Sequence, residues 1–225
     1  VADAKMRMFN ADGSEGKMCG NAIRCVAKYV YDNGIARKTT LKIETLSGVK
    51  TIYVNVKNGS VYSARVDMGK PELIPSKIPV SFDGDAVINA PIIVDNKKHN
   101  ITCVSMGNPH AVLFCNDLDK LDMAKIGPKF ENYPQFPEKI NTEFVKVVDS
   151  KTLKMRVWER GSGETLACGT GACASVVAAV LNGYCKKNED IRVILLGGEL
   201  TVKYTDEAVY MTGNCVKVFE GVIEL

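Results

Sequence analysis

Two cysteines, Cys19 and Cys168, carry the clearest chemical signal in the sequence. They open the stretches CGNAIRC and CGTGAC, and each is followed by apolar residues at helical spacing that end at an Asn-Gly pair. This pattern predicts that each cysteine stands immediately before or at the start of a helix. The free N–H groups and positive dipole end of a helix lower the pKa of a thiol there and bind a carboxylate. We therefore expect two thiols suited to proton transfer.

The segments that contain these cysteines are two copies of one unit. Residues 6–20, aligned without a gap on residues 155–169, share five identities, which include the cysteine and the glycine after it. Each copy continues with an apolar helix, a strand pair around a glycine (Gly48 or Gly198) and a third strand that opens with Val-Tyr. Order, spacing and chemistry agree, so the sequence predicts an internal duplication.

The two predicted helices differ in their surroundings. The first has apolar residues along one stripe, whereas the second, from about Thr170 to Asn182, is apolar nearly all round and must be enclosed on every side. Most of the remaining sequence has the pattern of short alternating strands broken by Gly, Pro and Asn. We therefore predict an α+β protein of two pseudo-symmetric domains, each an antiparallel sheet or barrel around a central helix.

The copies differ in what precedes them. Roughly 50 residues of strand-like sequence stand before Met155 in the second copy, whereas only five residues stand before Met6 in the first. We expect that a pair of strands and a loop, about 50 residues in all, is missing from the front of the first copy.

If the two halves face each other, two helix N-termini converge on one carboxylate with one sulfur on each side of its α-carbon. A thiolate could then take the α-proton from one face while the opposing thiol donates a proton to the other, which inverts the stereocentre. The two thiols should titrate as a coupled pair. Such a reaction requires no electron-sink cofactor, and the spacing of the cysteines does not match a structural zinc site.

Four motifs, FNADGSEGKMCGN, MGNPHAV, NTEFV and ERGSGETLACGTGACA, resemble the diaminopimelate epimerase family over the whole chain. Enzymes of this family interconvert LL- and meso-diaminopimelate without a cofactor. The resemblance implies that Cys19 and Cys168 are the acid/base pair. It also implies a first domain of residues 1–66 plus 214–225 and a second domain of residues 67–213. The chain departs from the family at Ala22-Ile23, where Gly-Ala is usual, and it lacks the N-terminal segment HGLGNDF.

The resemblance also implies the residues that hold the substrate. The distal amino-acid end would be recognised by Asn10, Asn108, Asn141, Glu159 and Arg160, and the reacting carboxylate would be held by Gly20, Asn21, Gly169 and Thr170. His110 and Glu159 would flank the site and help to set the protonation of the cysteines.

The residues themselves agree with part of this assignment. A zwitterionic substrate end calls for adjacent charges of both signs, as at Glu159 and Arg160. His110 follows a Gly-Asn-Pro turn into a strand, and we expect that strand to neighbour the second helix. Glu15 and Glu164 stand four residues before the cysteines, and we expect them to form hydrogen bonds that close the two loops.

Composition sets the broad class. The chain has 225 residues, 46% hydrophobic and 24% charged, and a formal charge of +3, which is typical of an ordinary globular protein and gives no basis for nucleic-acid binding. No uncharged apolar stretch approaches the 18 or so residues that a membrane helix needs. We expect a reducing, cytoplasmic setting with free thiols, no metal or cofactor, and a small-molecule substrate, diaminopimelate. A homodimer is compatible with the sequence.

Two alternatives remain open. A proline or hydroxyproline racemase also pairs two cysteines, although the polar asparagines and the ERGSGETLACGTG stretch suit a longer substrate with a second zwitterionic end. A redox or binding module could instead join Cys19 and Cys168 in a regulatory disulfide. Dinucleotide binding is disfavoured because GTGAC lacks the G-x-G-x-x-G pattern.

Overall fold

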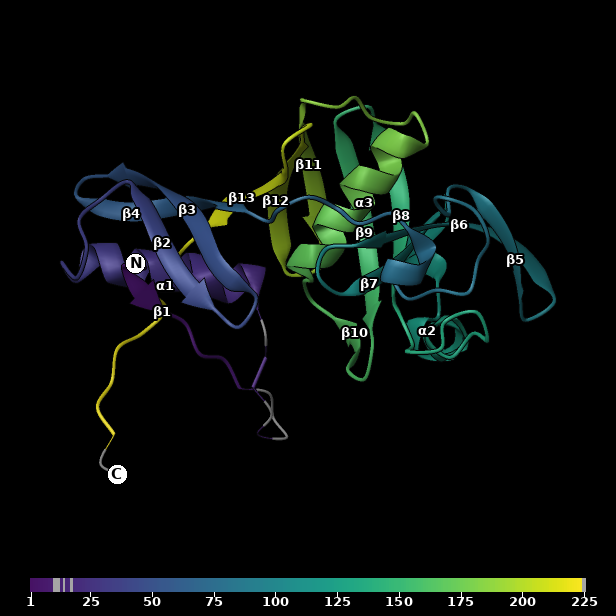
Figure 1. Ribbon diagram of the computed structural model, residues 1–225, viewed down its shortest axis with the longest axis horizontal. Coiled ribbons are helices and arrows are strands. Elements are labelled where there is room, and N and C mark those ends of the chain that lie inside the picture. The colour runs from purple at the N-terminus through teal and green to yellow at the C-terminus, as the bar shows by residue number, and fades with distance from the viewer. Residues whose placement is uncertain (10–12, 14, 17, 224–225) are drawn as a thin grey trace. The chain divides into compact units, whose positions relative to one another are not determined.

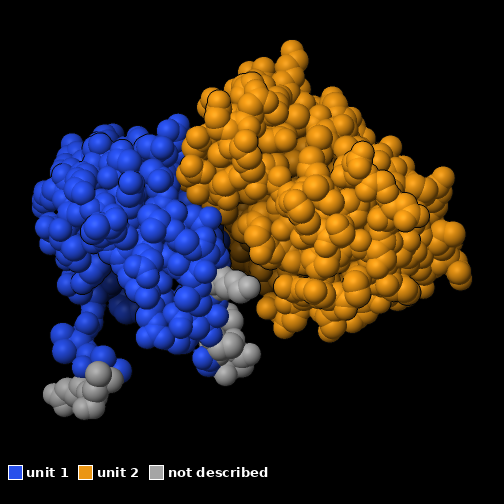
Figure 2. All heavy atoms as spheres, in the orientation of Figure 1, with its two compact units in different colours: residues 1–66, 212–225 blue, residues 67–211 orange. Residues whose placement is uncertain are grey.

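The structure, a computed structural model, describes residues 1–9, 13, 15–16 and 18–223. It divides into two compact units, Val1–Val66 with Thr212–Leu225, and Asp67–Met211 (Figure 2). Strand β13 (Val209–Asn214) runs from the second unit into the first.

The first unit is a small sheet with one helix. Its strands β1 (Ala4–Lys5), β2 (Thr40–Thr45), β3 (Gly48–Lys57) and β4 (Ser60–Asp67) lie in that order. The β2–β3 and β3–β4 pairs are antiparallel, whereas β1 pairs with β2 in parallel. Helix α1 (Gly20–Asp32) packs against β2 and β3 (Figure 1).

Sequence periodicity accounts for this packing. In β2 the exposed and buried residues alternate, and Leu41 and Ile43 face inward with no exposed surface. The stripe on α1 buries Ile23, Ala27 and Val30. The helix and the strand pair around Gly48 were both predicted, and the structure confirms them.

The second unit holds the remaining elements. Its strands are β5 (Ala90–Val94), β6 (Lys97–Ser105), β7 (Pro109–Phe114), β8 (Asn141–Asp149), β9 (Thr152–Glu159), β10 (Gly163–Thr165), β11 (Asp190–Leu195), β12 (Gly198–Tyr204) and the first part of β13. Its helices are α2 (Met123–Glu131) and α3 (Gly169–Leu181), with the short 3-10 helices η1 (Pro75–Lys77) and η2 (Leu118–Lys120).

The strands of this unit follow the order β13-β12-β11-β9-β8-β7-β6-β5, and β10 pairs with β9. Hairpins make most neighbours antiparallel, as predicted, but β7 pairs with β8 and β9 with β11 in parallel. A parallel pair needs a long crossover connection. Helix α2 lies in the first crossover and α3 in the second.

Helix α3 is enclosed by its sheet. It contacts β6, β7, β8, β9, β11 and β12, and nearly every residue from Gly169 to Ala179 is buried (Figure 1). This confirms the prediction that a helix apolar all round is the centre of a domain.

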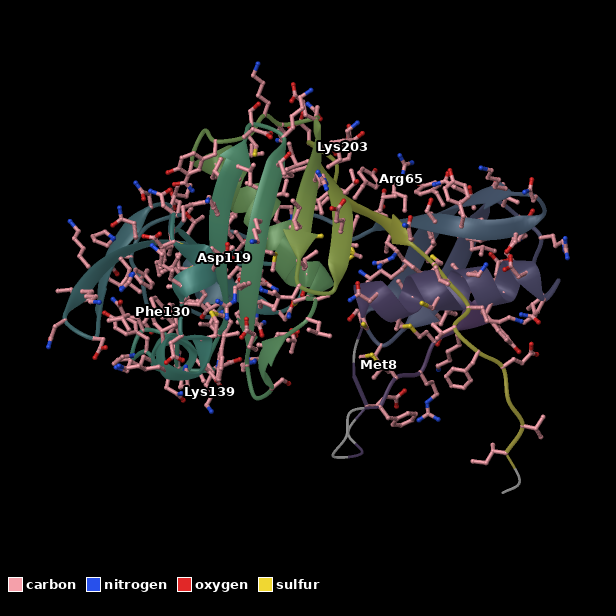
Figure 3. The ribbon with its side chains drawn as sticks, turned by 180° about the vertical axis from the view of Figure 1, so that it is seen from behind. Met8, Arg65, Asp119, Phe130, Lys139 and Lys203 are labelled. Atoms are coloured by element: carbon pink, nitrogen blue, oxygen red, sulfur yellow. The ribbon has the colours of Figure 1, made fainter. Side chains whose placement is uncertain are left out.

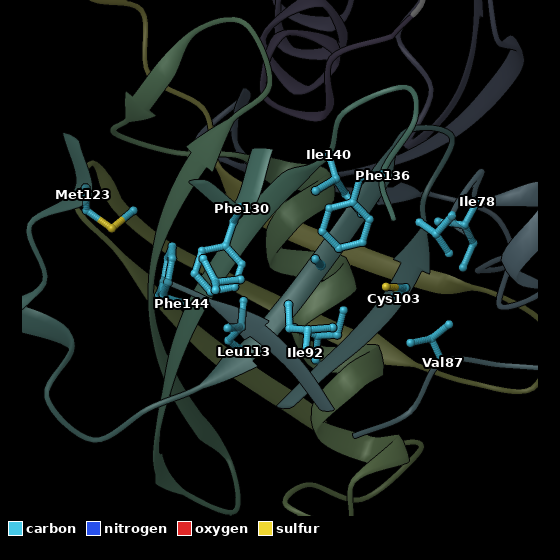
Figure 4. Close-up of a cluster of buried hydrophobic side chains, with 14 of the residues drawn as sticks. Ile78, Val87, Ile92, Cys103, Leu113, Met123, Phe130, Phe136, Ile140 and Phe144 are labelled. Carbon is cyan, nitrogen blue, oxygen red and sulfur yellow. The ribbon is translucent and has the colours of Figure 1, made fainter. Parts of the chain in front are cut away.

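A second hydrophobic cluster lies between the strands and α2. Phe130 of α2 meets Phe144 of β8 edge to face, with ring centroids 5.4 Å apart (Figure 4). The sequence analysis predicted no helix between the strand-like stretches before Met155, so α2 was missed. The reason is the pair Gly127-Pro128 inside a helix of nine residues, because both residue types disfavour a helix interior. At Gly127 a Cβ would lie 2.2 Å from the ring of Trp158, so only glycine fits there.

Candidate active site

Both cysteines are helix N-caps, as predicted. Cys19 precedes α1 with φ −136° and ψ 117°, and Cys168 precedes α3 with φ −120° and ψ 111°. Ala22 N–H donates to Cys19 Sγ at 3.4 Å, and Gly171 N–H donates to Cys168 Sγ at 3.3 Å. The thiol thus takes the place that a Ser or Asp oxygen usually takes at an N-cap. Each unit presents one sulfur beside the free N–H groups of a first helical turn.

The loop before each cysteine is closed by the same Arg–Glu pair. Arg7 donates from Nε and Nη2 to Glu15 at 2.9 and 3.0 Å, and Arg156 donates from the same atoms to Glu164 at 2.7 and 3.0 Å. Arg156 also donates to the main-chain oxygen of Leu121 at 2.9 Å. The expected loop-closing hydrogen bonds of both glutamates are confirmed, and their partners are the arginines of the repeat.

The environment of Cys168 differs from that of a solvent-exposed thiol at a helix N-terminus. Its side chain is buried, and Thr170 Oγ1 lies 3.4 Å from Sγ. Burial raises the pKa of Cys168 above its usual value, and the carboxylates of Glu159 and Glu143 raise it further. The expected lowering of the pKa is therefore wrong for Cys168, because burial and two nearby carboxylates outweigh the hydrogen bonds from Thr170 and the Gly171 N–H.

The β9–β10 hairpin carries the predicted charged residues. Glu159 Oε1 accepts a short hydrogen bond from Thr165 Oγ1. The main-chain N–H of Arg160 donates to Asn141 Oδ1 at 2.9 Å, and its guanidinium donates to the main-chain oxygen of Glu138 at 2.7 Å. The carboxylate of Glu159 and the guanidinium of Arg160 are thus both held at the end of one hairpin.

Helix α2 anchors this hairpin. Trp158 Nε1 donates to Glu131 Oε2 at 2.7 Å, and the Gly161 N–H donates to Glu131 Oε1 at 3.1 Å. Lys139 Nζ lies 3.5 Å from the same carboxylate and is labelled in Figure 3. Burial raises the pKa of Glu131, but the hydrogen bonds from Trp158 and Gly161 and the charge of Lys139 outweigh it and lower the pKa overall. The Glu131 carboxylate therefore stays ionised, and its hydrogen bonds hold the turn at Gly161 in place.

His110 lies on β7 with no exposed surface. Its Nδ1 is 2.7 Å from Glu143 Oε1 on β8, and its Nε2 is 3.0 Å from Asn108 Oδ1. Helix α3 contacts β7, as predicted from the sequence. Glu143 was missed by the sequence analysis, although a charged residue within the buried run 141–145 is an available signal.

Three predicted residues form hydrogen bonds within the protein itself. The Asn141 Nδ2 group donates to the main-chain oxygen of Pro109 at 2.9 Å while its Oδ1 accepts from Arg160. In the first unit, Arg24 Nη1 donates to the Gly20 oxygen at 3.0 Å and to Asn21 Oδ1 at 3.1 Å.

The predicted residues fall in both units. Asn108, His110, Asn141, Glu159, Arg160, Cys168, Gly169 and Thr170 belong to the second unit, and Cys19, Gly20 and Asn21 to the first. Asn10 lies outside the described residues. Among the residues that the structure describes, no group of three or more His, Cys, Asp or Glu is placed to hold a metal ion. In the same residues no helix has the length and apolar character to cross a membrane.

Comparison with known proteins gives one answer at the level of sequence. The profile of the family described as diaminopimelate epimerase matches residues 1–74 and 102–218. The diaminopimelate epimerase of Acetivibrio thermocellus is 54% identical over 226 residues, which cover 100% of this chain and 80% of that protein. The diaminopimelate epimerase of Desulfovibrio desulfuricans is 55% identical over 230 residues, which cover 98% of this chain and 79% of that protein.

Solved structures confirm the predicted fold class. A hydroxyproline epimerase from Agrobacterium vitis superposes with a TM-score of 0.68 at 14% identity, covering 93% of this chain and 67% of that one. A phenazine biosynthesis protein of the PhzF family from Bacillus anthracis superposes with a TM-score of 0.66 at 18% identity, covering 99% and 82%. These likenesses concern the fold, whereas the sequence matches define the family. The chain belongs to the diaminopimelate epimerase family.

Proposed function

We propose that this protein converts LL-diaminopimelate to meso-diaminopimelate by two-base epimerisation, with Cys19 and Cys168 as the acid/base pair. Its family is one of epimerases that act on a small molecule, and its relatives carry that name. The observation that supports the two-base assignment is the matched N-cap geometry of the two cysteines.

In the proposed reaction one cysteine, as a thiolate, removes the proton from the α-carbon. The other cysteine, as a thiol, delivers its proton to the opposite face, so that the stereocentre inverts and the charges of the two sulfurs are exchanged. The first-turn N–H groups at Gly20, Asn21, Gly169 and Thr170 bind the α-carboxylate and stabilise the charge that develops beside the α-carbon.

The surroundings of Cys168 support a direction for the first turnover. Its raised pKa favours the neutral thiol at pH 7, so we assign Cys168 as the proton donor of the first turnover, which leaves the role of base to Cys19. The cycle leaves the roles reversed, and a proton exchange with solvent restores them. The carboxylates of Glu159 and Glu143 favour the thiol form of Cys168.

The distal zwitterionic end of the substrate is assigned to five residues. The carboxylate of Glu159 and the guanidinium of Arg160 meet its ammonium and carboxylate groups, and the amides of Asn10, Asn108 and Asn141 complete the hydrogen bonding. Glu159 and Arg160 lie on one hairpin, which supports a joint role.

The two compact units are proposed as the two epimerase domains, each of which supplies one cysteine. We place the enzyme in the cytoplasm, as a monomer or homodimer that binds no nucleic acid, because a reducing compartment keeps both thiols available. Cys19 and Cys168 are both free thiols in the structure.

Two alanine variants test the proposal. Cys19→Ala and Cys168→Ala should each lose epimerisation of LL-diaminopimelate, while Cys25→Ala, which removes an exposed thiol of α1, serves as the control. Retained epimerisation in either of the first two variants contradicts the two-base assignment.

A racemase of the proline or hydroxyproline type is the second candidate, because a hydroxyproline epimerase shares the fold. Turnover of proline or trans-4-hydroxy-L-proline by the wild-type protein, with no turnover of diaminopimelate, would select it. A redox module would instead show an activity that depends on a Cys19–Cys168 disulfide and disappears on reduction.

A further inference from the structure

Glu143 is a buried carboxylate that the proposed proton transfer does not use directly. It lies in the middle of β8, and neither its side chain nor that of His110 has any exposed surface. Burying a charged group costs several kcal/mol unless it is paired and hydrogen-bonded. Its Oε2 atom has no hydrogen-bond partner among the described residues, so the residue is poorly explained as a contributor to stability.

The other oxygen of Glu143 fixes the ring of His110. Nδ1 of His110 lies 2.7 Å from Glu143 Oε1, and Nε2 lies 3.0 Å from Asn108 Oδ1. Turning the ring over would break the hydrogen bond at Nδ1 and the contact at Nε2. Asn108 Oδ1 is an acceptor, so the contact at Nε2 is a hydrogen bond only while Nε2 carries a proton. An ionised carboxylate can only accept a hydrogen bond, so it requires a proton on Nδ1.

The same oxygen also lies against the first turn of α3. A Cβ built at Gly171 would be 2.5 Å from Glu143 Oε1. The main-chain N–H of Gly171 is the donor to Cys168 Sγ, at 3.3 Å. One carboxylate oxygen therefore packs between the imidazole of His110 and the helical turn whose N–H donates to the Cys168 sulfur.

Four titratable groups act on this carboxyl or feel its charge from the surrounding strands and helix. Burial raises the pKa of the Glu143 carboxyl overall, and Glu159 on β9 adds to this, whereas the charge and hydrogen bond of His110 on β7 and a main-chain hydrogen bond lower it. The Glu143 charge raises the pKa of Cys103 on β6 and of Cys168 at the start of α3. Of the four titratable groups, His110 is the one that favours the ionised form of Glu143.

We propose that Glu143 is a positioning residue of the epimerase site, which holds His110 in one orientation with Nδ1 protonated and supports the helical turn whose N–H donates to Cys168 Sγ. His110 then presents Nε2 toward Asn108. The catalytic consequence rests on the proposed function, whereas the placement of the proton on Nδ1 does not depend on it.

Two variants of Glu143 separate the effect of its negative charge from the effect of its side-chain length. Glu143→Gln keeps the shape and an acceptor oxygen but removes the charge, and Glu143→Asp keeps the charge but withdraws the carboxylate by one methylene. Glu199→Gln and Glu199→Asp are matched controls, because Glu199 is an exposed glutamate on β12 of the same unit. We expect kcat to fall by about 100-fold in both Glu143 variants, the lower end of a general acid/base contribution, with KM changed less than threefold.

Nitrogen-15 NMR of the histidine ring gives a readout that a merely structural role would not move. The chain has two histidines, His99 and His110, and a His99→Gln sample assigns their signals. In the wild type we expect His110 Nδ1 to be protonated, and in Glu143→Asp we expect Nδ1 to be unprotonated in part of the molecules. Unprotonated Nδ1 in the wild type, ring shifts unchanged in Glu143→Asp, or a kcat no lower than in the Glu199 controls would each overturn the proposal.

The two proposals fail in different ways. A wild-type protein that does not epimerise diaminopimelate contradicts the proposed function, while its ring shifts still decide whether Glu143 places a proton on Nδ1. A wild-type protein that epimerises but shows Nδ1 unprotonated contradicts only the role of Glu143, and this measurement requires no Glu143 variant to fold.

Discussion

Arg156 and Glu164 are joined by two parallel hydrogen bonds of 2.7 and 3.0 Å across the β9–β10 hairpin. The pair is partly buried, with 15% and 27% of the two side chains exposed. Lysine cannot reproduce the two-pronged geometry of a guanidinium. Arg156→Lys should therefore lower the free energy of unfolding by about 2 kcal/mol, the range for hydrogen bonds to charged groups, and lower kcat because the loop before Cys168 loosens. Urea unfolding and steady-state kinetics measure the two effects.

The control for this prediction is the pair Arg192–Glu199, which has the same geometry but lies on the surface with about half of each side chain exposed. Arg192→Lys should cost less than about 0.5 kcal/mol, as exposed ion pairs do. Equal losses in Arg156→Lys and Arg192→Lys would show that the buried pair has no special role.

Gly127 is required by the ring of Trp158. Because a Cβ at this position would lie 2.2 Å from the ring, Gly127→Ala must displace Trp158 or tilt α2. We expect a loss of about 1 to 3 kcal/mol in unfolding free energy, as for overpacked cores. Gly221→Ala is the control, since nothing lies within 4 Å of its Cβ position. A Gly127→Ala protein as stable as the control would contradict the packing described for α2.

The hydrogen bonds from the β9–β10 hairpin to Glu131 should affect substrate binding more than the rate of proton transfer. Glu131→Gln weakens the hydrogen bonds to Trp158 and Gly161, which hold the turn that carries Glu159 and Arg160. We expect KM to rise about tenfold, equivalent to about 1.4 kcal/mol, with a smaller change in kcat. The chain has one tryptophan, so a shift of its fluorescence emission reports the broken contact directly.

Glu207→Gln is the control for this change, because Glu207 is exposed in the turn before β13. An unchanged KM in Glu131→Gln, together with a shifted emission, would show that the hairpin does not position the substrate.

Buried thiols should make the protein less stable at alkaline pH. Burial raises the pKa of Cys103 to about 12 and of Cys185 to about 11, against about 8.5 in an unfolded chain. As the pH rises, the unfolded state loses these protons first. The stabilisation is therefore complete below about pH 8.5 and is lost between that pH and the folded-state values.

Each such thiol contributes up to about 1.4 kcal/mol per pH unit to the slope of unfolding free energy against pH. Urea unfolding between pH 8.5 and 10.5 should show a shallower slope in Cys103→Ala than in the wild type. The exposed Cys25→Ala variant should keep the wild-type slope. Identical slopes in all three proteins would mean that Cys103 ionises as readily in the folded state as in the unfolded state.

The local structure around the cysteines could be predicted because it depends on residues that are close in the sequence. Cys168 and its helix stand in one continuous pattern of small and apolar residues that ends at Asn182, and the repeat doubles that signal at Cys19. The loop-closing hydrogen bonds of Glu15 and Glu164 are equally local, because each partner lies eight residues away; that these partners are Arg7 and Arg156 came from the structure.

The features that were missed depend on contacts between distant segments. Glu143 meets His110 only because β7 and β8 are parallel neighbours joined through α2. The raised pKa of Cys168 depends on burial and on two carboxylates from other strands. A helix that contains Gly127 and Pro128 forms because Phe130 packs in the hydrophobic cluster and Trp158 fills the space above the glycine.

The central claim is proton transfer by two different groups. The isotope content of product formed early in a reaction in deuterated water tests this claim most directly. With LL-diaminopimelate and the wild-type protein, the meso product formed in the first few per cent of reaction should carry deuterium at the inverted α-carbon, because the donated proton comes from a thiol that has exchanged with solvent. The recovered LL substrate should still carry hydrogen. Product that retains its original α-hydrogen would show that one group both removes and returns the proton, and would contradict the account.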